Sequence, residues 1–174
     1  MMRFLPILMA AAAAAFAQAP TLPPEIERLS KDARETVTVT MDAKLLQFAA
    51  AFLSERNPEE ARVKKMVAGL KNVVVRSFEF DRDQTYGAAE LNALRSQYST
   101  GGGWQKAVEV RSKLGENTDV YFRPQGQELN GLAVVVAEPR ELTVVYVEGA
   151  IKPEEVADLG GHFGLPRFGR RSWR

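Results

Sequence analysis

The sequence predicts a single α+β domain, with a largely antiparallel sheet of about five to six strands and helices packed on one face. Two observations carry this prediction. Helix-like segments occupy the first half of the chain, and four strand-like segments joined by short turns follow in the second half. The expected order is β-α-α-β-α-β-β-β-β-α, which lacks the strict alternation of a doubly wound sheet.

The first residues have the three parts of a secretory signal peptide. Arg3 precedes an uninterrupted apolar run over Phe4–Phe16, and small residues follow at the position where a signal peptidase acts. As a helix this run would extend only ~20 Å, less than the ~30 Å hydrocarbon core, which argues against an uncleaved anchor. We expect cleavage after Ala17, export to the periplasm or the extracellular space, and no transmembrane segment in the mature chain.

The chain divides into four regions on these grounds. Residues 1–17 are the signal peptide, 18–34 a leader with a short helix, 35–166 the α+β domain, and 167–174 a flexible basic tail. The mature chain is long enough for one hydrophobic core. It contains no cysteine, so that core forms without disulfides.

The first strand and helix follow from local patterns. Thr36–Thr40 alternates strictly and is β-branched throughout, which predicts a strand. Asp42 then stands where a helix N-cap is expected. Apolar residues between Leu45 and Leu53 fall on one helical stripe.

A second helix begins after Asn57, because Pro58 suits the first helical position and Glu60 can complete a capping box. Its apolar residues recur at helical spacing over Val63–Leu70. We expect the two helices to form a hairpin with facing apolar stripes. Leu46 and Val67 should then be buried.

The middle of the chain predicts another strand and helix. Asn72–Phe80 is rich in valine and phenylalanine, which indicates a strand. Gly87 followed by Glu90 starts a helix that ends near Tyr98. The three glycines at 101–103 then form a flexible joint.

Four strands complete the sheet, with hairpin turns at Gln125-Gly126 and Pro139-Arg140 and a bulge at Asn130-Gly131. Leu132–Ala137 is apolar on both faces, so its strand should be central and covered. Pro153 opens a last short helix that closes at Gly160. The four strands span about Gln105–Ser112, Asp119–Arg123, Leu129–Glu138 and Glu141–Glu148.

The side chains that most enzymes and metal sites use are scarce. There is no cysteine, and His162, the single histidine, lies in a glycine-rich loop without a nucleophile motif. Asp81-x-Asp83-x-Thr85 begins like a calcium loop, but the glycine and glutamate that such a loop requires are absent. The glycines at 101–103 follow a predicted helix and match no phosphate-binding fingerprint. We predict no catalytic residue, no metal site and no cofactor.

Charged residues on or beside the predicted strands are the candidate binding residues. They either form cross-strand pairs or line a sheet face that binds a partner. The tail arginines are a second candidate, for an envelope protein or an anionic surface, whereas export argues against nucleic acid. The sheet candidates are Arg76, Glu79, Arg111, Arg123, Glu138 and Arg140, and the tail candidates are Arg167, Arg170, Arg171 and Arg174.

Several segments, in order, resemble the domain of unknown function 4252 family of exported bacterial proteins. The resemblance covers about Leu22–Pro166 and leaves out the basic tail. It implies an exported domain without an assigned reaction, so no catalytic residue is carried over. The matching stretches are residues 35–39, 45–49, 69–71, 75–80, 131–133, 137–143 and the closing Gly160-Gly161-His162-Phe163-Gly164.

The leading hypothesis is an exported, non-catalytic envelope domain that binds a protein or ligand through its sheet face or its glycine loops. One alternative is a hydrolase that uses carboxylates such as Glu79 or Glu138, and another is a structural envelope protein. Buried carboxylates gathered in one cleft would favour the hydrolase. A flat sheet without a deep pocket would favour the binding domain.

Overall fold

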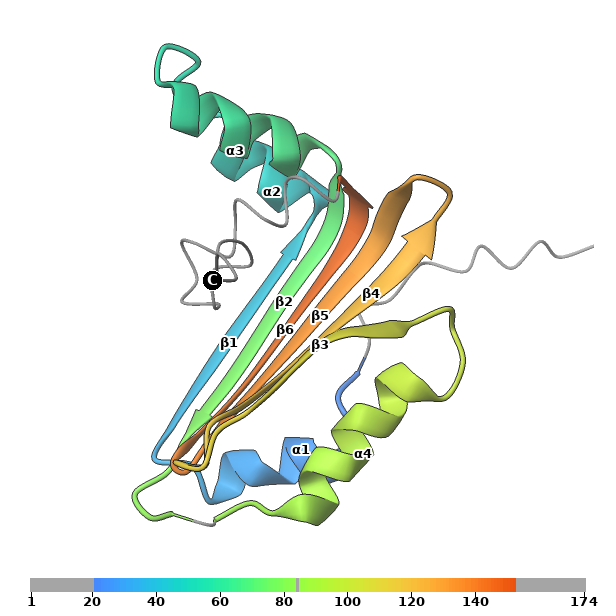
Figure 1. Ribbon diagram of the computed structural model, residues 1–174. Coiled ribbons are helices and arrows are strands. Elements are labelled where there is room, and N and C mark those ends of the chain that lie inside the picture. The colour runs from blue at the N-terminus through green and yellow to red at the C-terminus, as the bar shows by residue number, and fades with distance from the viewer. Residues whose placement is uncertain (1–20, 84, 153–174) are drawn as a thin grey trace, which may run out of the picture.

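A computed structural model describes residues 21–83 and 85–152 and confirms the α+β fold (Figure 1). Six strands form one antiparallel sheet in the order β1-β2-β6-β5-β4-β3. The elements are α1 (Pro24–Arg28) with a 3-10 turn over Leu29–Lys31, β1 (Glu35–Asp42), α2 (Ala43–Ala50), α3 (Pro58–Ala68), β2 (Leu70–Glu79), α4 (Ala88–Ser99), β3 (Gln105–Arg111), β4 (Asn117–Gln125), β5 (Glu128–Glu138) and β6 (Glu141–Ile151).

The signal peptide, the helix expected from Pro153, His162 and the basic tail lie outside the described residues. Within them, the predicted helix starts are confirmed by their hydrogen bonds. The Asp42 carboxylate accepts from the Leu45 amide at 2.8 Å, and the Asn57 side chain accepts from the Glu59 amide at 3.0 Å. The Gly87 amide donates to the Glu90 carboxylate at 2.9 Å. Each bond satisfies a backbone group that a helix start would otherwise leave unpaired.

The prediction for β5 is confirmed, because it lies between β6 and β4 and its apolar residues are almost all buried. The bulge expected at Asn130-Gly131 is also present, as a register shift between Leu129 and Gly131. Gly131 leaves room there for the Trp104 side chain. A Cβ on it would lie 2.8 Å from the Trp104 ring, inside any real contact distance.

Helices cover one face of the sheet. The main core contains Ile26 of α1, Leu29 of the 3-10 turn, Leu94 and Tyr98 of α4, and strand residues such as Phe78. Fully burying a side chain of this size contributes roughly 1.5–3 kcal/mol, so this layer is the main source of stability.

The opposite face holds a second apolar cluster made only of strand residues. Val120, Leu132 and Val134 are buried at its centre. No helix residue of the described ranges 21–83 and 85–152 belongs to this cluster. The two faces therefore differ, and we call the second one the open face.

The predicted helical hairpin is confirmed, with α2 and α3 in contact at the end of the sheet far from α1 (Figure 1). Leu46 is 4% exposed, as expected. The expectation for Val67 was wrong, because this side chain is only half-buried and no residue of α3 is fully buried. Much of the predicted stripe faces solvent, including Phe48 within α2 and Phe52 beyond the end of α2 at Ala50.

Candidate functional site

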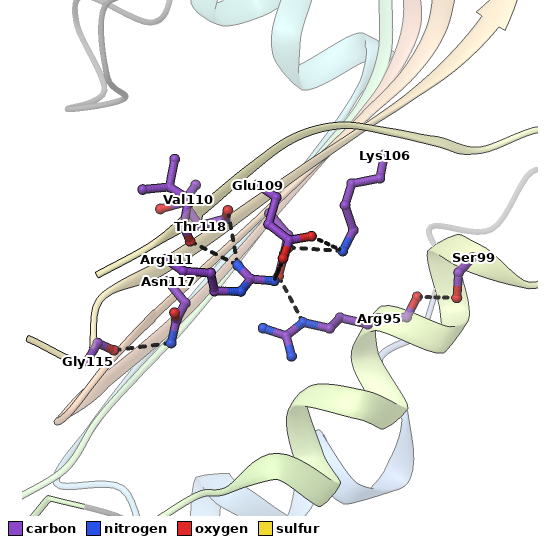
Figure 2. Close-up of polar contacts among 10 residues, drawn as sticks. Arg95, Ser99, Lys106, Glu109, Val110, Arg111, Gly115, Asn117 and Thr118 are labelled. Carbon is purple, nitrogen blue, oxygen red and sulfur yellow. Dashed lines mark hydrogen bonds and ion pairs between the residues drawn. The ribbon is translucent and has the colours of Figure 1, made fainter. Parts of the chain in front are cut away.

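Four charged side chains surround Asp119 of β4 on the helix-bearing face (Figure 2). Arg95 donates from Nε to Oδ2 of Asp119 at 2.8 Å, and Arg111 donates from Nη2 to Oδ1 at 2.7 Å. Lys106 Nζ lies 3.3 Å from the same Oδ1. Glu109 pairs with both Lys106, at 2.8 Å, and Arg111, at 3.2 Å. We call these five residues the Asp119 cluster.

The strands place this cluster through their register. A bulge between Lys106 and Val108 puts Lys106 on the same face as Glu109 and Arg111, and all three lie opposite β4 residues of that face. Arg95 reaches the same carboxylate from α4, one helical position after the buried Leu94. The cluster thus joins the edge strand β3, the inner strand β4 and the helix α4.

The neighbouring arginines determine the protonation state of the Asp119 carboxyl. Burial raises the pKa of this carboxyl, but hydrogen bonds from Arg111 and Arg95 outweigh burial and hold the pKa below its ordinary value. Asp119 is 1% exposed and is the one buried charged side chain in the described part of the chain. Its oxygens are already occupied by cations, so it cannot act as a general base.

Spare hydrogen-bonding capacity in and beside the cluster belongs to Arg95 and Tyr121. Arg95 uses only its Nε, so its terminal nitrogens have no partner among the described residues. The buried hydroxyl of the neighbouring Tyr121 also has no partner there. Lys106 lies over the Tyr121 ring, 5.7 Å from its centre, which adds a cation–π contact. This arrangement suits a structural tie more than a site that opens to a ligand.

An aromatic layer continues the cluster along the same face. Tyr98 packs against Tyr121 and Trp104, with ring centres 5.3 and 5.2 Å apart. Arg123 lies over Trp104 at 5.0 Å and donates from Nε to the Asn130 side chain at 2.6 Å. These contacts fill the space between α4 and the sheet, so the layer belongs to the core.

The six sheet residues predicted as binding candidates do not gather in one place. Arg111 is in the Asp119 cluster, and Arg123 lies on Trp104. Arg76 donates to the Thr38 hydroxyl at 2.7 Å and pairs with Glu27 at 3.6 Å. All three sit on the helix-bearing face and contact neighbouring elements.

The other three candidates lie where strands end. Glu79 pairs with Arg34, and Arg140 pairs with Asp83. Glu138 has no ion-pair partner among the residues at 21–83 and 85–152. Its pKa is raised by burial and by the nearby carboxylates of Glu141 and Glu116.

Sequence reasoning missed Asp119 and Arg95. The alternation of β4 contained a signal for Asp119, because it places Asp119 on the same face as Tyr121 and Arg123. Arg95 carried no comparable signal, since its role depends on how α4 crosses the sheet.

Two shallow hollows lie at the ends of the sheet. One of about 300 Å³ is lined by Asp83, Tyr86, Glu138 and neighbouring residues. Burial raises the pKa of the Tyr86 hydroxyl to about 12, and this hydroxyl lies against the carbonyl oxygens of Glu138 and Glu141. The other, of about 140 Å³, has Lys71 and Glu148 on its wall. Neither contains residues from the centre of the open face.

The open face carries apolar residues on all six strands, interrupted by one row that contains Ser77, Thr143 and Thr118. Its outermost member, Val37, is exposed, and the others are half-buried or buried. At one end the register aligns four glutamates in a row, Glu35, Glu79, Glu141 and Glu138. The apolar residues of this face are Val37, Val39, Met41, Val73, Val75, Val108, Val110, Val120, Phe122, Leu132, Val134, Val136, Val145 and Val147.

The described ranges contain no group of three or more histidine, aspartate or glutamate side chains that could hold a metal ion. They also contain no helix with the length and hydropathy needed to cross a bilayer.

The comparison with protein families gives one match. The family described as domain of unknown function, DUF4252, matches residues 30–159. No curated protein and no solved structure matches the chain.

Proposed function

The chain belongs to the DUF4252 family, and from that premise we propose that it is an exported, non-catalytic domain that binds a partner protein on the open face of its sheet. The observation that carries the proposal is the apolar side of β1 and β2 on this face, where Val37 is exposed and Val39 and Val75 are half-buried, and against which no described helix packs. Apolar surface gains about 25 cal/mol per Å² when it leaves water, so a broad apolar face favours association.

The shape of the face favours a protein over a small ligand. Small-molecule sites are concave, whereas the two described hollows lie at the sheet ends and are lined by other residues. Rows of valine pack well against a second sheet or an amphipathic helix. The row of glutamates that begins with Glu35 would face basic side chains on the partner.

Two features support a role without catalysis. The buried carboxylate of Asp119 is fully engaged by Arg95, Arg111 and Lys106, so it serves the fold. The sequence holds one histidine and no cysteine, which leaves few candidates for a nucleophile or a general base. The proposed export rests on the signal peptide over residues 1–17.

A photo-crosslinking amino acid placed on the two sides of β1 tests the proposal. In the exported protein, a crosslinker at Val37 on the open face should give one defined adduct, and a crosslinker at Thr36 on the other face should not. A Val75→Lys substitution on the open face should abolish the adduct without lowering the melting temperature below that of a Thr40→Lys control. An adduct of twice the chain mass identifies the partner as a second copy. Equal yields from both sides, or no adduct from Val37, would contradict the proposal.

One observation favours a second candidate, a carboxylate-dependent hydrolase. Glu138 has a raised pKa and borders the larger hollow beside Asp83. Glu79, the other carboxylate considered for this role, is neutralised by Arg34. Hydrolysis of an ester or glycoside probe that is lost in a folded Glu138→Gln variant would support this candidate over the binding domain.

A further inference from the structure

The α2–α3 hairpin carries an exposed apolar patch that no part of the fold uses. Four of the six large apolar side chains exposed in residues 21–83 and 85–152 lie on it, namely Leu45, Phe48, Phe52 and Val63. Phe48 is 63% exposed and Phe52 is 76% exposed. We call these four residues the hairpin patch.

Leu45 and Phe48 of the patch are in α2, Phe52 follows the end of α2, and Val63 is in α3. Leu46 and Ala50 are buried on the inner side, whereas Leu45, Phe48 and Phe52 recur at helical spacing on the outside. The rings of Phe48 and Phe52 contact each other edge to face, with centres 5.2 Å apart. Figure 1 places the hairpin at the end of the sheet away from α1, where α3 extends beyond the strands.

Unpaired cations lie along the hairpin and at the start of β2. Residues 43–71 contain six lysines and arginines and three glutamates. Lys64 pairs with Glu55, and Glu60 is held by the Ser54 amide and the Asn57 side chain. Within the described residues the other five cations have no ion-pair partner, and all five are exposed: Lys44, Arg56, Arg62, Lys65 and Lys71.

The rest of the described chain has the opposite charge. Outside residues 43–71 it holds 12 basic and 16 acidic residues. The hairpin is therefore a positive end on a negative body, and an anionic surface would orient the molecule with the hairpin toward it.

We propose that the α2–α3 hairpin docks this protein on an anionic lipid surface, with Phe48 and Phe52 entering the headgroup boundary. A hairpin that combines exposed aromatic rings with unpaired lysine and arginine is what interfacial binding requires. The proposal does not depend on the proposed function, because the open face is a different surface.

Vesicle binding by the mature chain tests the inference. The protein should sediment with vesicles that contain phosphatidylglycerol, much less with phosphatidylcholine alone, and less as salt is added. Phe52→Ser should weaken binding about tenfold, from the lost burial of one aromatic side chain. Lys65→Glu should weaken it by a similar factor, because it reverses one charge near the surface.

Matched controls come from the β3–β4 turn, away from the hairpin. Leu114 is 80% exposed, and Lys113 beside it is exposed. Lys113→Glu makes the same charge reversal there, Leu114→Ser likewise replaces an exposed apolar side chain by serine, and both should leave binding within about twofold of the parent. Melting temperatures equal to the parent confirm that all four variants are folded.

A truncated variant that ends at Pro166 lacks the tail arginines, so it distinguishes binding by the hairpin from binding by the tail. If this chain still binds anionic vesicles and loses binding on Phe52→Ser, the hairpin is the docking site. Three results would overturn the proposal: hairpin variants that bind like their controls, binding that disappears with residues 167–174 alone, or a Phe52→Ser variant that loses self-association while vesicle binding is unchanged.

Discussion

Arg95 and Asp119 lie 24 positions apart in the sequence, yet the Nε of Arg95 is 2.8 Å from a carboxylate oxygen of Asp119. This contact fastens α4 to β4, and Arg111 fastens the edge strand β3 to the same carboxylate. The carboxylate is buried, so both hydrogen bonds are shielded from water and are stronger than surface ion pairs.

Substituting Asp119 tests this role. Asp119→Asn should lower the free energy of unfolding by roughly 1.5–3 kcal/mol, the usual range for hydrogen bonds to a charged group. Urea denaturation measures the loss. Glu109→Gln is the control, because Glu109 contacts two of the same cations from an exposed position and should cost much less. Equal losses would show that burial of Asp119 is unimportant.

The stabilisation by Asp119 should depend on pH in one direction. Its pKa is lower in the folded state than its ordinary value of 3.8, because cation hydrogen bonds outweigh burial. A carboxyl whose pKa is lowered by folding stabilises the fold at pH values above its ordinary pKa. This stabilisation is lost as the pH falls through the folded-state pKa. The parent and Asp119→Asn should therefore differ most near neutral pH and converge below pH 3.8.

Glu138 should behave in the opposite way. Its pKa is raised above 4.5 by burial and by neighbouring carboxylates, so its ionised form disfavours the folded state above that pH. Glu138→Gln should raise the melting temperature at neutral pH and leave it unchanged well below pH 4.5. Glu128→Gln, at the start of β5, is a control with the same chemical change. A lower melting temperature for Glu138→Gln at neutral pH would contradict the assignment.

Replacing a buried and a half-buried side chain of the hairpin by alanine should reduce the stability of the fold by different amounts. Leu46→Ala should cost roughly 2–4 kcal/mol, from lost transfer energy and a residual cavity. Val67→Ala should cost less, because Val67 keeps part of its surface in water. Chemical denaturation of the two variants provides the comparison, and an unchanged curve for Leu46→Ala would mean that α2 does not pack on the sheet.

Gly149 should tolerate no side chain. A Cβ there would lie 2.4 Å from the Gly69 carbonyl oxygen and 2.5 Å from Leu70 Cα, which are backbone atoms that cannot easily move. Gly101 also has a positive φ but has open space around it. Gly149→Ala should therefore be less stable than Gly101→Ala by about 1–3 kcal/mol, the usual cost of overpacking. Thermal denaturation of both variants measures the loss of stability that comes from the steric clash at Gly149.

Processing of the N-terminus is a separate prediction. Mature protein should begin at Gln18, because the residues around Ala17 suit a signal peptidase. N-terminal sequencing of exported material gives the answer directly. Protein that retains Met1 and stays in the membrane fraction would mean that the apolar run is an uncleaved anchor.

The sequence by itself determined the elements whose signals are local. Asp42 and Asn57 each cap a helix through their own side chains, and the bulge at Asn130-Gly131 lies within one strand. The alternation of valine and threonine in β1 required no distant partner either. Hydrogen bonds and steric limits of this kind act over a few residues, so a pattern of residues suffices to predict them.

The tertiary structure alone decided which side chains meet. Arg111 and Arg123 support the core because α4 covers their face of the sheet. The alternation of residues along a strand would be the same if α4 covered the other face, so the sequence pattern cannot decide between the two faces. The same limit applies to Phe48 and Phe52, whose stripe is as apolar as a core stripe. Only the position of the hairpin at the end of the sheet leaves them in water, because burial depends on contacts between segments far apart in the chain.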